Sequence, residues 1–293
     1  MSAIRFEHVD VVFAKDPTAA LALMDQGEDR ETILERTGAV VGVHGAHLGI
    51  EPGEICVLMG LSGSGKSSLL RSVNGLNRVS RGRVLVSHEG GEVDIGSAAP
   101  AQLRDLRMNR ISMVFQQFAL MPWRTVRDNV GLGLELRGIH ADERERRVAE
   151  KLALVRLEPW AHKRPHELSG GMQQRVSLAR AFALRPPVLL MDEPFAALDE
   201  ITRSQMRYLL LDVWRDTGAT VVFVTHSIDE AVHLSDRVLV LTTRPGRLSA
   251  EITIKLDRPR RPGIEDIDEF HHHAAELRAA LNAANGRSNE VGP

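Results

Sequence analysis

Three short, almost uninterrupted apolar runs stand out in the pattern of hydrophobic and polar positions. They are residues 55–59 (ICVLM), 188–191 (VLLM) and 220–225 (TVVFVT). Continuous runs of this length predict strands that are buried on both faces, as in a parallel sheet covered by helices. Polar or glycine-rich residues follow each run. We therefore expect the carboxyl ends of these strands to face a ligand crevice.

The N-terminal third alternates between strand and helix patterns. Residues 4–13 predict a strand with Val9, Val11 and Phe13 on one face. Phe13 either packs in the core or stacks on a nucleotide base, which needs only an accessible ring face.

Residues 14–39 read as a helical insertion before the next strand. The first helix is expected to start with Asp16 as N-cap and Pro17 at the first helical position, and to stop at Gly27. The second is expected over about 29–36, ending at Gly38.

The remaining pattern predicts short antiparallel strands over 82–95, a helix over 101–109, a strand over 111–115 that leads to Gln116, and helices through 125–157. A terminal helix over 264–284 carries an apolar stripe at Phe270, Ala274, Leu277 and Leu281. The histidine triplet 271–273 fans around that helix and cannot face one ion, so we expect it to be solvated. We expect residues 286–293 to be frayed.

Composition narrows the possible classes. The 293 residues include 37 basic and 39 acidic side chains, which argues against a broad nucleic-acid surface. The single cysteine, Cys56, lies in an apolar run and is expected to be a buried core residue. The N-terminus does not resemble a signal peptide, and no run of about 18 apolar residues predicts a membrane span.

The run at 55–59 leads directly into a phosphate-binding motif. Residues 60–67, GLSGSGKS, match the pattern G-x-x-x-x-G-K-[ST], and a helical pattern follows from Lys66. Glycines let the backbone turn its N–H groups inward, and the helix N-terminus adds partial positive charge. Lys66 would reach the β- and γ-phosphates, and the Ser67 hydroxyl would bind Mg²⁺.

Two further stretches carry candidate chemistry. Residues 168–175, LSGGMQQR, open another helix with a serine and two glycines, which suits a phosphate. The run at 188–191 ends in Asp192 and Glu193, whose side chains point to opposite faces of a strand and so have separate tasks. Asp192 would hold Mg²⁺ directly or through water, and Glu193 would polarise the attacking water. His226 follows the third run at the same strand-end level.

These motifs occur in the order that is typical of the ATP-binding subunits of ABC transporters. The chain resembles that family over about residues 1–245, through the 60–67 loop, Gln116, LSGGMQQR, MDE at 191–193, ALD at 197–199 and His226. The phrases ILERTGAVVGV, MGLSGSGKSS, VFQQFALMP and LMDEPFAALD are similar to the ATPases of quaternary-amine importers, which take up glycine betaine, proline betaine or choline.

The resemblance implies an α/β fold: a P-loop (RecA-like) ABC ATPase core, an antiparallel β edge subdomain and an α-helical signature subdomain. The implied domains are an ATPase domain over 1–258, containing the 14–39 insertion and a helical subdomain at about 118–175, and an extension over 259–293.

The resemblance also implies that two copies meet head to tail, each ATP lying between one copy's 60–67 loop and the other's signature stretch. The nucleotide would contact Phe13, Gly60, Leu61, Ser62, Gly63, Ser64, Gly65, Lys66, Ser67 and Ser68, and across the dimer Ser169, Gly170, Gly171 and Gln173. Glu193, His226 and Gln116 would be catalytic, Ser67, Gln116 and Asp192 would hold Mg²⁺, and Asp199 would reach across the dimer.

The implied partners are integral-membrane permease subunits and a periplasmic or extracellular substrate-binding protein, with no nucleic acid. The implied location is peripheral, on the cytoplasmic face of the inner membrane. Many betaine relatives continue into a paired regulatory module of more than 100 residues, for which no length remains here. Residues 243–247 and 259–262 resemble instead the tails of nitrate and sulfonate importer ATPases. The ATPase of another importer, including an amino acid importer, or of an exporter therefore stays an alternative.

Overall fold

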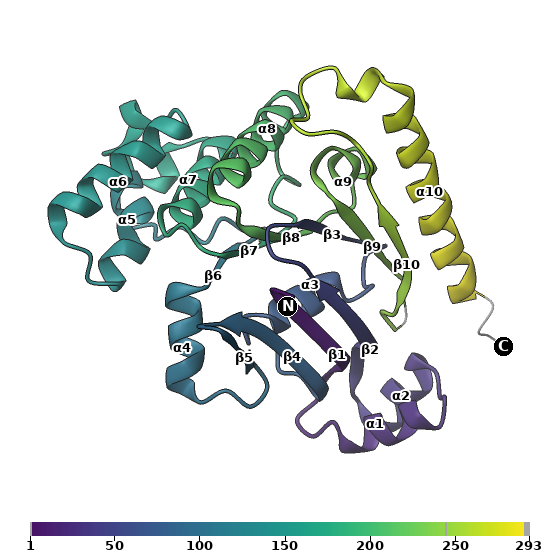
Figure 1. Cartoon of the computed structure of the whole chain (residues 1–293). Helices are drawn as coiled ribbons and strands as arrows, with labels where there is room; N and C mark the ends of the chain where they lie inside the picture. Colours follow the sequence, from purple (N-terminus) through teal and green to yellow (C-terminus); the bar gives the residue numbers. More distant parts are fainter. Residues whose placement is uncertain (1, 244, 290–293) are drawn as a thin grey trace. The chain divides into compact units, whose positions relative to one another are not determined.

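The computed structural model describes residues 2–243 and 245–289. These residues form two compact units (Figure 1): unit 1 comprises residues up to Leu103 together with those from Val222 onward, and unit 2 comprises Arg104–Val221. These units are defined by contacts within the chain, whereas the boundaries predicted at 258/259 and around 118–175 divide the chain by expected function. The predicted boundaries therefore stay predictions. Among the described residues, none of the helices combines the length and the apolar character that a membrane crossing would need.

Unit 1 contains two groups of strands. An antiparallel sheet has the order β2-β1-β4-β5, formed by β1 (Ile4–Phe13), β2 (Val40–Ile50), β4 (Arg81–His88) and β5 (Gly91–Asp94). The second group contains β3 (Ile55–Met59), β9 (Arg237–Leu241) and β10 (Leu248–Thr253), with β3 parallel to β9 and β10 antiparallel to β9. Strand β8 (Thr220–Val224) belongs to this unit from Val222 onward. All five residues of β3 and of β8 are buried, as their apolar runs predict.

The helices of unit 1 are α1 (Thr18–Asp25), α2 (Arg30–Thr37), α3 (Lys66–Ser72), α9 (Ile228–Leu234) and α10 (Asp268–Asn289), and α4 (Pro100–Asn109) crosses the division between the units after Leu103. Both insertion helices are therefore present. Asp29 caps α2 by accepting a hydrogen bond from the Thr32 N–H, and Gly38 ends it with a φ of +67°. The first cap was predicted one residue too early, because Pro17 is itself the N-cap of α1 and Asp16 accepts from the Thr18 N–H instead.

Strand β1 does not keep a simple alternation. Its pairing with β2 shifts register between Phe6 and Val12, so that residues 9–12 are all buried while Phe13 is 46% exposed. The prediction that Val9, Val11 and Phe13 share one face was wrong at Phe13, because bulges change the side to which successive residues point.

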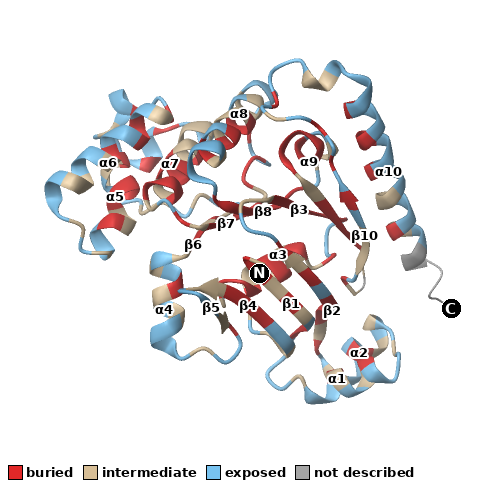
Figure 2. Ribbon diagram, in the orientation of Figure 1, coloured by how far each residue is buried: buried red, intermediate tan, exposed pale blue. Residues whose placement is uncertain are grey.

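Helix α10 packs against α9, β9 and β10, and Figure 2 shows buried positions spaced along it. The predicted stripe is buried at Phe270, Ala274 and Leu277. The solvated histidine triplet was wrong at His273, which is 8% exposed and accepts a hydrogen bond from the Lys255 N–H at Nε2. The helix also continues to Asn289 instead of fraying from residue 286; residues 290–293 lie outside the described part of the chain.

Unit 2 contains the parallel pair β6 (Ile111–Val114) and β7 (Val188–Asp192) and the helices α5 (Val126–Leu136), α6 (Ala141–Leu154), α7 (Gly170–Ala183) and α8 (Glu200–Thr217). Helices α5, α6 and α7 pack together (Figure 1). Their shared core includes Val130, Leu134, Val148, Leu152 and Val176. The core packs α7, whose first turn carries the signature stretch, against α5 and α6.

Candidate functional site

The loop that follows β3 has the backbone that a phosphate cradle needs. Gly60, Gly63 and Gly65 all have positive φ angles, of 151°, 79° and 80°. At Gly65 a side chain is also excluded by space, because a Cβ atom there would lie 2.4 Å from the Gly42 carbonyl oxygen. Only glycine combines that conformation with that close approach. The loop then hands over directly to α3 at Lys66.

Lys66 is 6% exposed, and its ammonium group turns back into the loop. Nζ donates to the carbonyl oxygens of Gly60 and Leu61 at 2.9 and 2.8 Å. Because these acceptors belong to the loop itself, the positive charge is held at the mouth of the cradle, where phosphate oxygens would compete for the same hydrogens.

Phe13 lies at the end of β1 with 46% of its surface exposed. Its ring passes close to Gly42, where a Cβ atom would be 2.9 Å from Phe13 Cε2. This exposure does not fit a core residue, so of the two readings from the sequence the geometry favours an accessible ring face for stacking.

His226 follows β8 and is exposed. The corner around it is fixed by a buried pair, because the Thr225 hydroxyl donates to Glu230 Oε2 at 2.5 Å. The Ser227 N–H donates to Thr225 Oγ1 at 3.0 Å, and the Ser227 hydroxyl caps α9 by accepting from the Glu230 N–H. Thr225 and Glu230 therefore set the direction of the chain at His226. The sequence analysis missed both, and the available signal was the acidic first turn of α9, which carries Asp229 and Glu230.

In unit 2 the end of β7 brings together two of the predicted catalytic residues. Asp192 is buried at 1% exposure, and Glu193 leaves the strand with a φ of +45°. The Gln116 side-chain amide, which follows β6, donates to Glu193 Oε2 at 3.2 Å. The parallel pairing of β6 and β7 explains the contact, since both strands end at the same edge.

The signature stretch forms the start of α7. The Ser169 hydroxyl accepts from the Met172 N–H at 3.3 Å, and the Gln173 side chain donates to the Leu168 carbonyl at 3.2 Å. Gly170 and Gly171 occupy the first two helical positions, with a Cβ at Gly171 coming within 3.3 Å of Thr202 on α8. The N-terminal amides of α7 are thus presented without side chains in front of them.

Asp199 has a local task within this chain. It is the N-cap of α8, and the hydrogen bond from the Thr202 N–H at 2.9 Å holds the pKa of its carboxyl below the usual range. A role across a dimer would be additional to this cap.

Arg180, which the sequence analysis did not single out, connects α7 to the segment after Gln116. Its guanidinium donates to the carbonyl oxygens of Phe118 and Ala119 at 3.0 and 2.7 Å, and burial lowers its pKa. One helix therefore carries the signature stretch at its start and fixes the Gln116 segment from its third turn.

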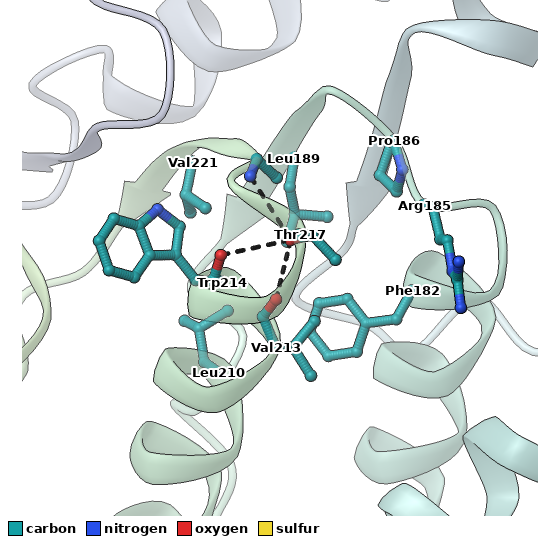
Figure 3. Close-up of a pocket in the computed structure, with 10 residues that line it drawn as sticks. Phe182, Arg185, Pro186, Leu189, Leu210, Val213, Trp214, Thr217 and Val221 are labelled. Atoms are coloured by element: carbon teal, nitrogen blue, oxygen red, sulfur yellow. Dashed lines mark hydrogen bonds between the residues drawn. The ribbon is translucent and has the colours of Figure 1, made fainter. Parts of the chain in front are cut away.

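Unit 2 also has an apolar pocket of about 280 Å³, counted to its mouth (Figure 3). Phe182, Leu210 and Val213 line it together with Leu189, near the start of β7 and so at the far end of that strand from Asp192. The Thr217 hydroxyl beside it is satisfied by donation to the Val213 carbonyl at 2.8 Å. This pocket is therefore separate from the candidate chemistry.

The donor set predicted for magnesium is chemically suitable. A serine hydroxyl, an amide oxygen and a carboxylate, from Ser67, Gln116 and Asp192, are hard oxygen ligands of the kind Mg²⁺ prefers. No group of three or more metal-ligating His, Cys, Asp or Glu side chains occurs among the described residues. Mg²⁺ in nucleotide sites is commonly held by few protein groups together with phosphates and water, so the set fits that pattern.

Comparison with known families agrees with this geometry. The family model for ABC transporter matches residues 43–196, a range that contains the phosphate loop, the signature stretch, Asp192 and Glu193. The chain therefore belongs to the ABC transporter family, and its fold is that of a P-loop ABC ATPase with mixed α/β sheets.

Particular relatives narrow the comparison. The chain is 47% identical over 230 residues to the glycine betaine/proline betaine transport system ATP-binding protein ProV of Escherichia coli (strain K12), covering 78% of this chain and 56% of that protein. It is 44% identical over 238 residues to the glycine betaine transport ATP-binding protein OpuAA of Bacillus subtilis (strain 168), covering 81% of this chain and 56% of that protein. The chain thus spans a little over half the length of these relatives.

A solved structure of a dimeric ATP-binding cassette in a post-hydrolysis state, bound to ADP and Pi, is similar at a TM-score of 0.71 and 30% identity. That match covers 87% of this chain and all of the solved chain.

Proposed function

We propose that this protein is the ATP-hydrolysing subunit of an ABC importer that takes up a quaternary amine such as glycine betaine or choline. The observation that carries the proposal is the 44–47% identity to glycine betaine transport ATP-binding proteins over about four fifths of the chain. The Gln116–Glu193 contact at the end of β7 supports the hydrolytic part.

In this proposal the backbone amides of the 60–65 loop and Lys66 bind the phosphates of ATP, and Phe13 stacks on the base. Ser67, Gln116 and Asp192 would hold Mg²⁺, which neutralises charge on the phosphates when bound. Glu193 accepts a proton from the attacking water, and Gln116 orients the Glu193 carboxylate and that water. His226 contacts the γ-phosphate from the corner fixed by Thr225 and Glu230.

The signature residues act in a second copy of the chain. Ser169, Gly170, Gly171 and Gln173 present the start of α7 to the γ-phosphate held by the first copy's loop, and Asp199 lies at the same interface. ATP then favours the closed dimer, and hydrolysis removes the γ-phosphate contacts that favour it. Permease subunits and a substrate-binding protein would complete the system, with this chain on the cytoplasmic face of the membrane.

Two experiments test the proposal. Glu193→Gln should retain ATP binding while hydrolysis falls by about 100-fold or more, because a carboxamide cannot accept the proton; undiminished turnover would remove Glu193 as the base. For the transported solute, the chain is co-purified with its permease and binding protein and the binding protein is titrated with glycine betaine, choline, nitrate and a sulfonate. If the binding protein binds nitrate or a sulfonate and no quaternary amine, the proposal of quaternary-amine uptake fails and the chain is the ATPase of a nitrate or sulfonate importer.

A further inference from the structure

A polar pocket lies beside the insertion helices of unit 1, and none of its lining residues belongs to the phosphate loop. It measures about 250 Å³ including its open mouth. Helices α1 and α2, the turn between them, strand β2 and the segment before β10 supply its lining: Met24, Glu28, Arg30, Ile33, Val41, His44, Pro245 and Arg247. This volume suits a small ion and is below the usual size of a pocket for a drug-sized ligand.

The charges in this pocket are unbalanced. Arg30 and Arg247 both line it, whereas Glu28, its one carboxylate, already pairs with Arg36 at 3.1 Å. Within residues 2–243 and 245–289, neither Arg30 nor Arg247 has a carboxylate partner. Two arginines without a carboxylate partner on one small pocket favour an anion that accepts forked hydrogen bonds from guanidinium groups.

The walls of the pocket are fixed by a buried carboxylate. Asp10 is 1% exposed and accepts hydrogen bonds from His44 Nδ1, the Gly45 N–H and Arg81 Nε at 2.9, 2.7 and 2.6 Å. Arg81 Nη1 also donates to Asp25 at the end of α1, at 2.7 Å. The His44 ring and helix α1 are therefore held in place before any ligand arrives.

The apolar side of the insertion adds to this rigidity. Met24 of α1 and Ile33 of α2 belong to one buried cluster with Val41 of β2. Both of these helical residues also line the pocket. The insertion is thus packed onto β2, which precedes β3 and the phosphate loop in the chain.

The same two chain segments that line the pocket also touch the phosphate loop. Val43 and Gly246 form a parallel bridge, in which the His44 N–H donates to the Gly246 carbonyl at 2.8 Å. A Cβ at Gly246 would lie 2.1 Å from the Ser64 carbonyl oxygen, so the bridge is in direct contact with the loop. A shift of this bridge cannot leave the loop unchanged.

We infer that this pocket binds a small oxyanion, of the carboxylate, sulfate or phosphate class, between Arg30 and Arg247. The bound anion draws the insertion helix α2 toward the 245–247 segment and changes the affinity of the phosphate loop for nucleotide through the Val43–Gly246 bridge. The anion site stands independently of the proposed function. Its effect on nucleotide rests on the proposed ATP binding.

The test separates this site from the phosphate loop, which also binds anions. The full chain carrying Lys66→Ala is titrated calorimetrically with inorganic phosphate, sulfate and malonate. At least one anion is expected to bind saturably, and Arg30→Met with Arg247→Met is expected to weaken it by about tenfold or more. Arg78→Met removes an exposed arginine of unit 1 outside the pocket and serves as the matched control. Absence of saturable binding, or equal affinity with and without the two arginines, overturns the inference.

A second measurement tests the coupling. With Lys66 intact, the affinity for ATP is compared in the presence and absence of the anion identified in the titration. The affinity should change several-fold in the wild-type chain and stay constant in the Arg30→Met, Arg247→Met double variant. If the anion binds without changing the affinity for ATP, the proposed coupling is overturned, whereas the proposed anion site stands. Loss of ATP binding in the wild-type chain would instead count against the proposed function.

Discussion

Gly246 offers a direct way to disturb the phosphate loop from a distant part of the chain. It lies 182 residues after Ser64 of the loop, yet its amide donates to the Gly42 carbonyl at 3.3 Å and its α-carbon faces Ser64. Its backbone φ is one that any residue can adopt, so the effect of Gly246→Ala is steric. The variant tests whether the loop is held in place by this contact.

The size of the effect follows from the geometry. The added Cβ would be 2.1 Å from the Ser64 carbonyl oxygen, whereas real Cβ atoms essentially never come closer than 3.0 Å. The two segments must therefore separate by about 0.9 Å. Overpacking of this kind costs about 1–3 kcal/mol of stability. A displacement of about 1 Å at a catalytic loop reduces kcat/KM for ATP by up to about 100-fold.

The assay combines thermal unfolding, ATP binding and steady-state hydrolysis for Gly246→Ala and for Gly91→Ala. At Gly91 the nearest atom would be 3.8 Å from the new Cβ, which is an ordinary contact. The reasoning is refuted if Gly246→Ala binds and hydrolyses ATP as Gly91→Ala does. That result would mean that the backbone around Gly246 moves to accommodate the new Cβ and the phosphate loop does not.

Three further substitutions test individual contacts. Glu230→Ala should lower kcat by about tenfold with KM for ATP nearly unchanged, because the chain at His226 loses the contact that fixes it. Glu230→Gln, which can still accept the hydrogen bond from Thr225, should recover part of the lost kcat. An equal loss of kcat in the two variants would contradict this role of Glu230. Arg180→Met should lower the free energy of unfolding in urea by about 1–3 kcal/mol, because two carbonyls lose donors; Arg180→Lys should lose less. Burial opposes the ionisation of Asp10, but hydrogen bonds led by the one from His44 lower its pKa below 3.8 overall. The stability advantage over Asp10→Asn should thus be full above about pH 5 and shrink as pH falls through the lowered pKa; a pH-independent difference would contradict it.

The sequence predicted the strand and helix boundaries at which the contiguous motifs lie, while the roles of the motif residues stay predictions. The 60–67 loop, the start of α7 and the end of β7 each combine a few adjacent residues with a strand or helix boundary, so local patterns suffice. The contact between Gln116 and Glu193 could be anticipated because both follow parallel strands that end at one edge.

The sequence did not predict features that depend on packing between distant segments. Arg180 donates hydrogen bonds to backbone carbonyls 61 and 62 residues away, and His273 accepts one from an amide 18 residues earlier, so neither leaves a local signal. The early cap at Asp16 and the misplaced face of Phe13 have a different cause. At Asp16 the helix starts one residue later, with Pro17 as its N-cap, and at Phe13 the bulges of β1 shift the register. The periodicity of the sequence cannot resolve a shift of one residue.

The central claim is that ATP is held between the phosphate loop of one copy and the signature stretch of another. The most direct measurement is the mass of the Glu193→Gln chain by light scattering with and without ATP and Mg²⁺, alongside the same chain carrying Ser169→Arg. The account predicts a dimer only with ATP for Glu193→Gln, and a monomer that still binds ATP when Ser169→Arg is added. A chain that binds ATP yet stays monomeric without Ser169→Arg, or that dimerises equally with it, would contradict the account.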